Sequence, residues 1–209
     1  MGLLPNVPSG SETVMPLARR FTPLTTVDEF LAMEFRDDAR YELVDGEIVG
    51  QAHPSPAHST LQIALGAALR DALREKGKRD GSRCRALSEA GVRPHFDPTH
   101  NYRVADLAVT CEPFDPEIPY TTAPVLLVEI LSPTEEKAQR AKLHAYAAMP
   151  SVREILFLDS RTIRAELHRR DSDNLWPAAP EVLEEDGRLV LETAGLDMPL
   201  AELYRDLGF

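Results

Sequence analysis

The chain has 209 residues, of which 43% are hydrophobic and 27% are charged, and its formal net charge is −11. This length and composition predict a single globular domain with a core of its own. The negative charge argues against a protein that coats nucleic acid through bulk charge, although it leaves room for a local basic face. No apolar run reaches the roughly 18 residues that a membrane span needs, so no membrane association is expected.

The two cysteines, Cys84 and Cys111, lie in separate segments and lack the spacing of a zinc site. The N-terminus also lacks a positively charged segment followed by an apolar core, so it does not read as a secretory signal. We therefore expect a cytoplasmic protein with two reduced thiols, because disulfides rarely persist in that compartment.

The N-terminal segment, residues 1–22, is rich in Pro, Gly and Ser and shows no periodicity. It predicts a flexible tail, with a single domain over residues 23–209. Thr26 and Glu29 have the spacing of a capping box, so a short helix should run from there to about Phe35.

A hairpin and a long helix are expected next. Asp45-Gly46 lies between the two alternating apolar runs of residues 41–49, which is a strong signal for a β-hairpin. From His58 to about Lys76, leucine and alanine recur at helical spacing, so this helix should pack one face on a sheet.

The remaining pattern alternates strands and helices. Ser132-Pro133-Thr134-Glu135 is a second capping box, and its helix should run to about Met149. Together the segments predict an α/β (α+β) fold, a mixed sheet with helices on its faces. Further elements are expected as strands at 85–93, 104–110, 125–131, 154–159, 162–168 and 187–192, and as a helix at 200–207.

Two of these strand-like runs each carry one carboxylate, Asp106 in the first and Glu129 in the second. A carboxylate in an apolar strand is costly to bury unless it is paired or binds a cation. If the two segments pair, both carboxylates could form an oxygen-rich site for a divalent metal such as Mg²⁺. The alternative is a buried ion pair or an edge carboxylate without a metal.

An ordered set of motifs supports the metal interpretation, although none of them is specific alone. They are Tyr41-Glu42-Leu43-Val44-Asp45-Gly46-Glu47, Ser55-Pro56-Ala57-His58, Ala105-Asp106-Leu107, Val128-Glu129-Ile130-Leu131-Ser132-Pro133, Lys142-Leu143-His144-Ala145-Tyr146 and Phe157-Leu158-Asp159. With this set, roughly residues 24–170 resemble the Uma-type restriction endonucleases of the PD-(D/E)XK nuclease superfamily.

The resemblance implies a restriction-endonuclease-like fold and a metal-dependent endonuclease that hydrolyses DNA phosphodiester bonds. Asp106 and Glu129 would bind Mg²⁺ or Mn²⁺, helped by the main-chain carbonyl of Ile130. The metal would lower the pKa of a bound water and stabilise charge on the scissile phosphate. A homodimer would fit this activity, since two subunits related by a two-fold axis often cut both strands.

The chain departs from the superfamily pattern at several positions. Leu131 stands where the superfamily has its lysine, and Ala105 stands where it has its proline. Uma-type sequences carry a lysine in the following helix instead, and Lys142 matches that residue. Ala138 replaces an aspartate often found four residues before it. These departures favour the alternative of a catalytically degenerate nuclease fold that acts as a nucleic-acid-binding or protein-interaction module.

Two further residues are candidates for the site. Glu42 matches the glutamate of the family's YEL motif and is a third possible metal-side carboxylate; the alternative is a strand carboxylate paired with an arginine such as Arg40. His58 is a candidate catalytic residue; the alternative is a histidine that starts a helix or is satisfied in the core. Tyr146 is expected to be a core aromatic. An unrelated small-molecule hydrolase is disfavoured because the chain lacks a GxSxG nucleophile elbow.

Overall fold

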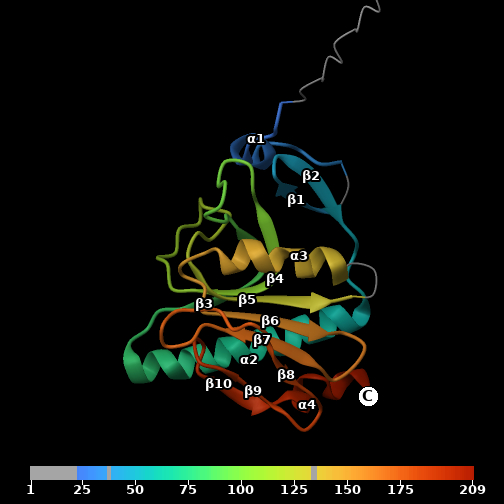
Figure 1. The fold of residues 1–209 in the computed structure, drawn as a ribbon, viewed down its shortest axis with the longest axis vertical. Coiled ribbons are helices and arrows are strands. Elements are labelled where there is room, and N and C mark those ends of the chain that lie inside the picture. Colours follow the sequence, from blue (N-terminus) through green and yellow to red (C-terminus); the bar gives the residue numbers. More distant parts are fainter. Residues whose placement is uncertain (1–22, 37–38, 133–135) are drawn as a thin grey trace, which may run out of the picture.

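The computed structural model describes residues 23–36, 39–132 and 136–209, which Figure 1 shows as a ribbon. The expected tail, residues 1–22, and residues 133–135 of the second capping box lie outside the described residues. The helices are α1 (Val27–Leu31), α2 (Pro56–Asp80), α3 (Glu136–Ala147) and α4 (Leu200–Leu203), followed by a 3₁₀ turn at Arg205–Leu207. The strands are β1 (Arg40–Val44), β2 (Glu47–Gln51), β3 (Arg85–Val92), β4 (Arg103–Thr110), β5 (Pro124–Leu131), β6 (Glu154–Asp159), β7 (Ala165–Arg169), β8 (Glu181–Leu183), β9 (Arg188–Leu191) and β10 (Leu196–Pro199).

The centre of the described fold is a six-stranded sheet in the order β3-β4-β5-β6-β7-β8. The neighbours β5 and β6 are parallel, and the other neighbouring pairs are antiparallel. A parallel pair needs a crossover, and α3 supplies it between β5 and β6. The mixed sheet with flanking helices that the sequence predicts is therefore confirmed.

The helices cover opposite faces of this sheet (Figure 1). α2 buries Leu61, Leu65 and Leu69 completely against one face, at the i, i+4 spacing of an amphipathic helix. Each buried leucine of this kind stabilises the fold by roughly 1.5–3 kcal/mol. α3 buries Tyr146 against the other face, in a core cluster that also contains Leu127. Within the described residues, none of the helices is long and apolar enough to cross a membrane.

A smaller unit of α1 and the β1–β2 hairpin sits at the start of β4. The turn residues Asp45 and Gly46 have φ values of 49° and 81°, which is the left-handed backbone that a two-residue hairpin turn requires. Leu43 and Tyr102 exchange main-chain hydrogen bonds of 2.8 and 2.9 Å. These bonds fix β1 beside the first residues of β4.

Several helix boundaries differ from the sequence prediction. α2 ends at Asp80 rather than near Lys76, and the helix expected at 200–207 is the shorter α4 followed by a 3₁₀ turn. α1 ends at Leu31 rather than near Phe35, because Phe35 leaves the helix and stacks on Tyr41 with ring centroids 4.1 Å apart. α2 begins at Pro56 rather than His58, because the Ser55 hydroxyl caps the helix. The short strands β8 and β10 were not predicted.

The expectation of two reduced thiols is wrong. Cys84 and Cys111 form a disulfide, with their Cα atoms 4.0 Å apart. Arg85 pairs with Thr110 across the antiparallel β3–β4 ladder, so the residue before β3 and the residue after β4 are direct neighbours. The separation of 27 residues hides this contact in the sequence, because it depends on strand register.

Candidate functional site

The two strand carboxylates lie where β4 and β5 stop pairing. The last paired residues at this end of the two strands are Leu107 and Val128. Asp106 and Glu129 are their immediate neighbours in the chain, just beyond the paired region. Beyond this point a side chain takes the place of a main-chain acceptor. Asp106 Oδ2 accepts a hydrogen bond of 2.7 Å from the main-chain N–H of Ile130. Both carboxylates are buried, with exposed fractions of 5% and 1%. The end of the ladder therefore places both predicted metal ligands inside the molecule.

Glu129 points toward α3, because its neighbours in β5 face α2. Its Oε1 accepts a hydrogen bond of 2.7 Å from the Tyr146 hydroxyl, and its Oε2 accepts one of 3.1 Å from Lys142 Nζ. Lys142 and Tyr146 are four residues apart, so both lie on one face of α3. Burial raises the pKa of Glu129 to about 8; Lys142 opposes this shift and Asp106 adds to it.

Lys142 lies at the centre of a buried charge cluster. Its Nζ is 2.8 Å from Glu42 Oε1, 3.1 Å from Glu129 Oε2 and 2.7 Å from the Val104 carbonyl. Glu42 Oε1 also accepts a hydrogen bond of 2.8 Å from Val104 N–H, which ties the hairpin to β4. Burial alone would lower the pKa of Lys142, but Glu129, Glu42 and Asp106 together raise it above its ordinary value. The ammonium is therefore charged at neutral pH.

His58 supports Asp106 from the other side of the sheet. Its Nε2 lies 3.1 Å from Asp106 Oδ1, and the side chain is 3% exposed. His58 Nδ1 has no hydrogen-bond partner among the described residues. One turn later on α2, Gln62 Nε2 donates to the Asp106 carbonyl at 2.9 Å. α2 thus holds both the side chain and the main chain of Asp106.

Glu89 is a carboxylate near the site that the sequence did not single out. It lies opposite Asp106 on β3, and the strand pairing skips both residues. Its φ of 49° is left-handed, a conformation that costs a non-glycine residue on the order of 1 kcal/mol or more. Its carboxylate accepts hydrogen bonds from Arg40 and from Gln62. Arg40 Nη1 also lies 3.8 Å from Asp106 Oδ1. Arg40 therefore pairs with Glu89 and Asp106 rather than with Glu42.

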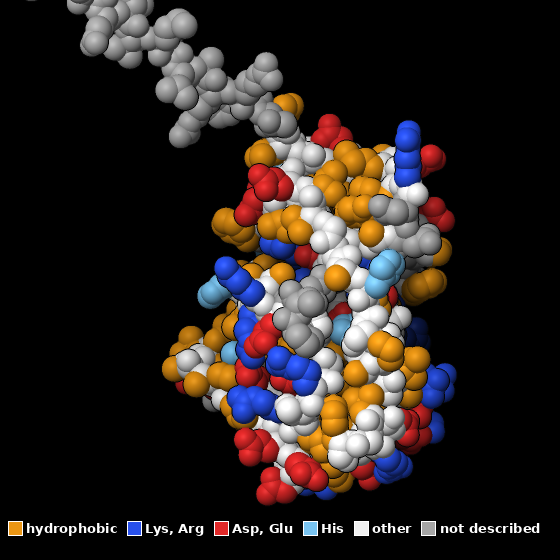
Figure 2. All heavy atoms as spheres, turned by 90° about the vertical axis from the view of Figure 1, so that its right-hand side faces the viewer, with side chains coloured by type: hydrophobic (Ala, Val, Ile, Leu, Met, Phe, Trp, Pro, Cys, Tyr) orange, Lys and Arg blue, Asp and Glu red, His pale blue; other side chains and the backbone are white. Residues whose placement is uncertain are grey.

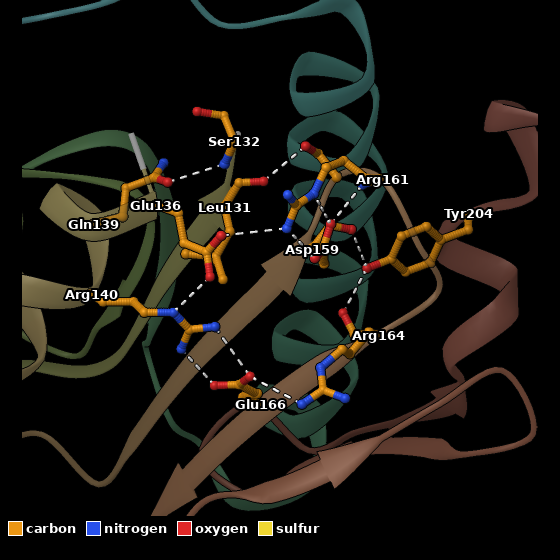
Figure 3. Close-up of polar contacts among 11 residues, drawn as sticks. Leu131, Ser132, Glu136, Gln139, Arg140, Asp159, Arg161, Arg164, Glu166 and Tyr204 are labelled. Atoms are coloured by element: carbon orange, nitrogen blue, oxygen red, sulfur yellow. Dashed lines mark hydrogen bonds and ion pairs between the residues drawn. The ribbon is translucent and has the colours of Figure 1, made fainter. Parts of the chain in front are cut away.

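Gln139 forms hydrogen bonds with the main chain just after Glu129, and Figure 3 shows its contact with Ser132. Its Nε2 donates to the Ile130 carbonyl at 2.7 Å, and its Oε1 accepts from Ser132 N–H at 3.1 Å. The Ile130 carbonyl was expected to help bind a metal, and in the structure it accepts this hydrogen bond. Gln139 comes three residues before Lys142, on the same face of α3.

An ion-pair network fixes the outer side of α3 (Figure 3). Arg140 bonds both oxygens of Glu166 on β7, at 2.7 and 3.2 Å, and it also pairs with Glu136 at 3.0 Å. Arg161 connects Glu136 to Asp159 at the end of β6. Exposed ion pairs contribute little to stability individually. The bidentate contact between Arg140 and Glu166 nevertheless sets the orientation of α3 over Glu129.

The charged residues line a cavity of about 240 Å³ between the hairpin, the sheet and α3. Its ionisable wall consists of three acids and three bases, namely Glu42, Asp106, Glu129, Arg40, Arg103 and Lys142. The described residues contain no group of three or more His, Cys, Asp or Glu side chains that could hold a metal. Burial raises the pKa of Glu129, and the neighbouring carboxylates of Asp106 and Glu42 add to this shift. Two buried carboxylates beside one cavity are thus a donor set that suits a hard divalent cation.

The surface charge is mixed rather than segregated. Figure 2 shows acidic and basic side chains interspersed across the middle of one face, and hydrophobic side chains gathered at the end that carries α1 and the hairpin. The described residues of this face thus form no broad basic surface, in keeping with the net charge of −11.

The mixed sheet and the carboxylates on two diverging strands place the protein in the class of restriction-endonuclease-like folds. The sequence profile of the Uma2 family, described as “Putative restriction endonuclease”, matches residues 27–201, and the chain belongs to this family. “Uncharacterized protein slr1290” of Synechocystis sp. is 29% identical over 189 residues, which are 90% of this chain and 95% of that protein.

A solved structure has the same fold. It is described as a “putative nuclease belonging to DUF820” from Anabaena variabilis. It matches with a TM-score of 0.66 over 86% of this chain and 97% of its own, at 19% sequence identity. At this identity the likeness concerns the fold.

Proposed function

We propose that the protein is a metal-dependent endonuclease that hydrolyses DNA phosphodiester bonds. The main support is the buried ammonium of Lys142, which contacts Glu42 and Glu129 on the wall of a cavity that Asp106 also lines. Buried ion pairs are often no more stabilising than apolar residues of similar volume. A cluster of this kind in a cavity, with a carboxyl pKa near 8, therefore suits chemistry better than folding.

Each residue then has a distinct role. Asp106 and Glu129 would hold Mg²⁺ or Mn²⁺, with the Ile130 carbonyl as a further oxygen ligand. When bound, the metal would lower the pKa of a coordinated water and neutralise charge on the phosphate. Lys142 would stabilise the developing negative charge, and its raised pKa makes it a cation rather than a general base.

Glu42 and His58 have supporting roles in this proposal. Glu42 bonds Lys142 Nζ at 2.8 Å and would keep the ammonium beside Glu129. His58 bonds Asp106 Oδ1 at 3.1 Å and does not line the cavity, so it would orient Asp106 without touching the substrate. We therefore assign both as positioning residues.

The second candidate is the catalytically degenerate nuclease fold that binds nucleic acid or a protein. One observation favours it. Both oxygens of Glu129 and the carbonyl of Ile130 already accept hydrogen bonds from protein groups, Tyr146, Lys142 and Gln139. A metal could use Glu129 only if at least one of these contacts lengthened, and that rearrangement costs binding free energy.

Titration of Mn²⁺ by calorimetry separates the two candidates. Wild-type protein should bind Mn²⁺, and Asp106→Ala/Glu129→Ala should not. Glu75→Ala/Glu202→Ala removes two carboxyl groups from exposed positions and should bind like wild type. Plasmid cleavage should be lost in Asp106→Ala and in Glu129→Ala. Cleavage that persists in both would refute the site, and absence of Mn²⁺ binding with and without DNA would favour the degenerate fold.

The remaining features of the proposal concern partners and location. DNA is the proposed substrate. A homodimer is proposed as the cutting unit, and the exposed Ile48 on β2 is an apolar residue that could contribute to its interface. Sedimentation of wild type and Ile48→Ser would test this. A cytoplasmic location also stays a proposal, and an oxidised Cys84–Cys111 pair in cells would speak against it.

A further inference from the structure

Arg103 is a cavity residue whose guanidinium lacks close partners. It begins β4, and its side chain is 15% exposed. Its Nη1 lies 3.6 Å from Glu42 Oε2, and its Nη2 lies 3.5 Å from Asn101 Oδ1. Its Nε is buried and has no hydrogen-bond partner among the described residues. Both of these contacts are longer than the 2.7–3.2 Å of an ordinary N–H···O bond.

Three other arginines in the described part of the chain have closer partners. Arg140 forms two bonds to Glu166, at 2.7 and 3.2 Å, and Arg169 bonds Glu154 at 2.9 Å. Arg40, the other arginine on the cavity wall, is paired with Glu89. A largely buried guanidinium without close acceptors is costly, because its donors lose water and gain little in return. Arg103 therefore has donors to offer to a group that enters the cavity.

We propose that Arg103 binds the phosphodiester anion of a nucleic-acid strand that enters the cavity. The inference rests on the proposed nuclease function, and it adds the residue that holds the substrate anion. A guanidinium presents its N–H groups as a planar fork that matches two phosphate oxygens. The cavity of about 240 Å³ is smaller than the roughly 300–1,000 Å³ of typical small-molecule pockets, so it suits a single phosphate group.

The arrangement of charges supports the same assignment. Lys142 is already held by the carboxylates of Glu42 and Glu129, and Arg40 is held by Glu89. Arg103 is the cationic residue on the described cavity wall that has no contact shorter than 3.5 Å to an acceptor. An anion placed at Arg103 would lie beside the carboxylate cluster without displacing an existing short ion pair.

The test is a metal-free binding experiment on the full chain. The dinucleotide d(TpT) is titrated into ¹⁵N-labelled protein while the arginine Nε–H signals are followed by NMR. The methylphosphonate analogue of d(TpT), which is neutral, serves as the matched ligand. We expect a saturable shift of the Arg103 Nε–H signal with d(TpT) and none with the analogue. Arg103→Gln should weaken d(TpT) binding at least about tenfold.

Two variants control for charge and folding. Arg188→Gln removes an exposed arginine that pairs with Asp197, and it should bind d(TpT) like wild type. Arg103→Lys keeps the charge but loses the fork, and it should bind with intermediate affinity. Equal binding by wild type and Arg103→Gln would overturn the inference. Binding of inorganic phosphate but not of d(TpT) would also overturn it, since the site would then serve free phosphate.

Cleavage assays distinguish failure of this inference from failure of the proposed function. If d(TpT) binds through Arg103 but the protein cleaves no DNA with Mg²⁺ or Mn²⁺, hydrolysis is refuted and the anion site stands. If DNA is cleaved and Arg103→Gln keeps the wild-type KM, the anion site is refuted and hydrolysis stands.

Discussion

The carboxylate of Asp106 accepts a hydrogen bond of 2.7 Å from the main-chain N–H of Ile130, at the point where β4 and β5 cease to pair. One side chain thus satisfies a main-chain donor that the diverging strands would leave unpaired, and it also lines the cavity. Since Ile130 follows Glu129 directly, this bond fixes the two carboxylates relative to each other.

Exchange of Asp106 for asparagine should separate these two roles. The asparagine oxygen can still accept from Ile130 N–H, so the free energy of unfolding should change by no more than about 1 kcal/mol. Asp106→Leu leaves that N–H buried and unpaired, so its free energy of unfolding should fall by about 1–3 kcal/mol. Urea unfolding measures both effects, and Mn²⁺ calorimetry should show no binding to either variant. Equal destabilisation of the two variants would contradict the structural role.

Glu129 should make stability depend on pH. Its pKa is about 8 in the folded protein against an ordinary value of 4.5, so the folded state holds the extra proton between these values. The stabilisation is therefore complete below about pH 4.5 and is lost as the pH rises through about 8, by up to about 1.4 kcal/mol per pH unit. Lys142 stays charged in this window and adds no slope.

Urea unfolding of wild type and Glu129→Gln from pH 5 to 9 tests this dependence. The free energy of unfolding of wild type should fall relative to the variant over that range. Saturating Mn²⁺ should flatten the decline, because a bound cation favours the ionised carboxylate. Parallel curves for wild type and Glu129→Gln would show that Glu129 does not hold the proton.

Lys142→Met should be strongly destabilising. It leaves Glu42 and Glu129 without their shared cation, and removal of one partner from a buried ion pair costs about 3–5 kcal/mol. The loss should grow above pH 8, where Glu129 is ionised. Lys78→Met, which removes an exposed pair with Glu75, should cost less than about 1 kcal/mol. Similar losses in the two variants would show that the cluster is not a coupled buried unit.

Much of the fold follows from local signals in the sequence. The capping box of Thr26 and Glu29 is present with both reciprocal hydrogen bonds. The Asp45-Gly46 turn forms the expected hairpin, and the apolar runs around Asp106 and Glu129 are neighbouring strands. These features were predictable because each depends on a few consecutive residues and one period.

The contacts that complete the site depend on packing. Tyr146 is the core aromatic that the sequence predicts, but its hydroxyl also bonds Glu129. The sequence does show that Gln139, Lys142 and Tyr146 share one face of a helix. Their role at the site follows only from the structure, which places that face over Glu129. The left-handed backbone of Glu89 gave no sequence signal, because glycine or asparagine usually marks that conformation.

The Cys84–Cys111 disulfide should contribute to stability but not to the site. It closes a sequence separation of 27 residues, for which loop-closure entropy gives about 3–4 kcal/mol. Cys111 lies about 16 Å along an extended strand from Asp106. Cys84→Ser/Cys111→Ser should therefore unfold at lower urea concentration and keep wild-type affinity for Mn²⁺. Dithiothreitol should destabilise wild type to the same level and leave the serine variant unchanged. Equal stability of oxidised wild type and the serine variant would mean that the bridge does not form in solution.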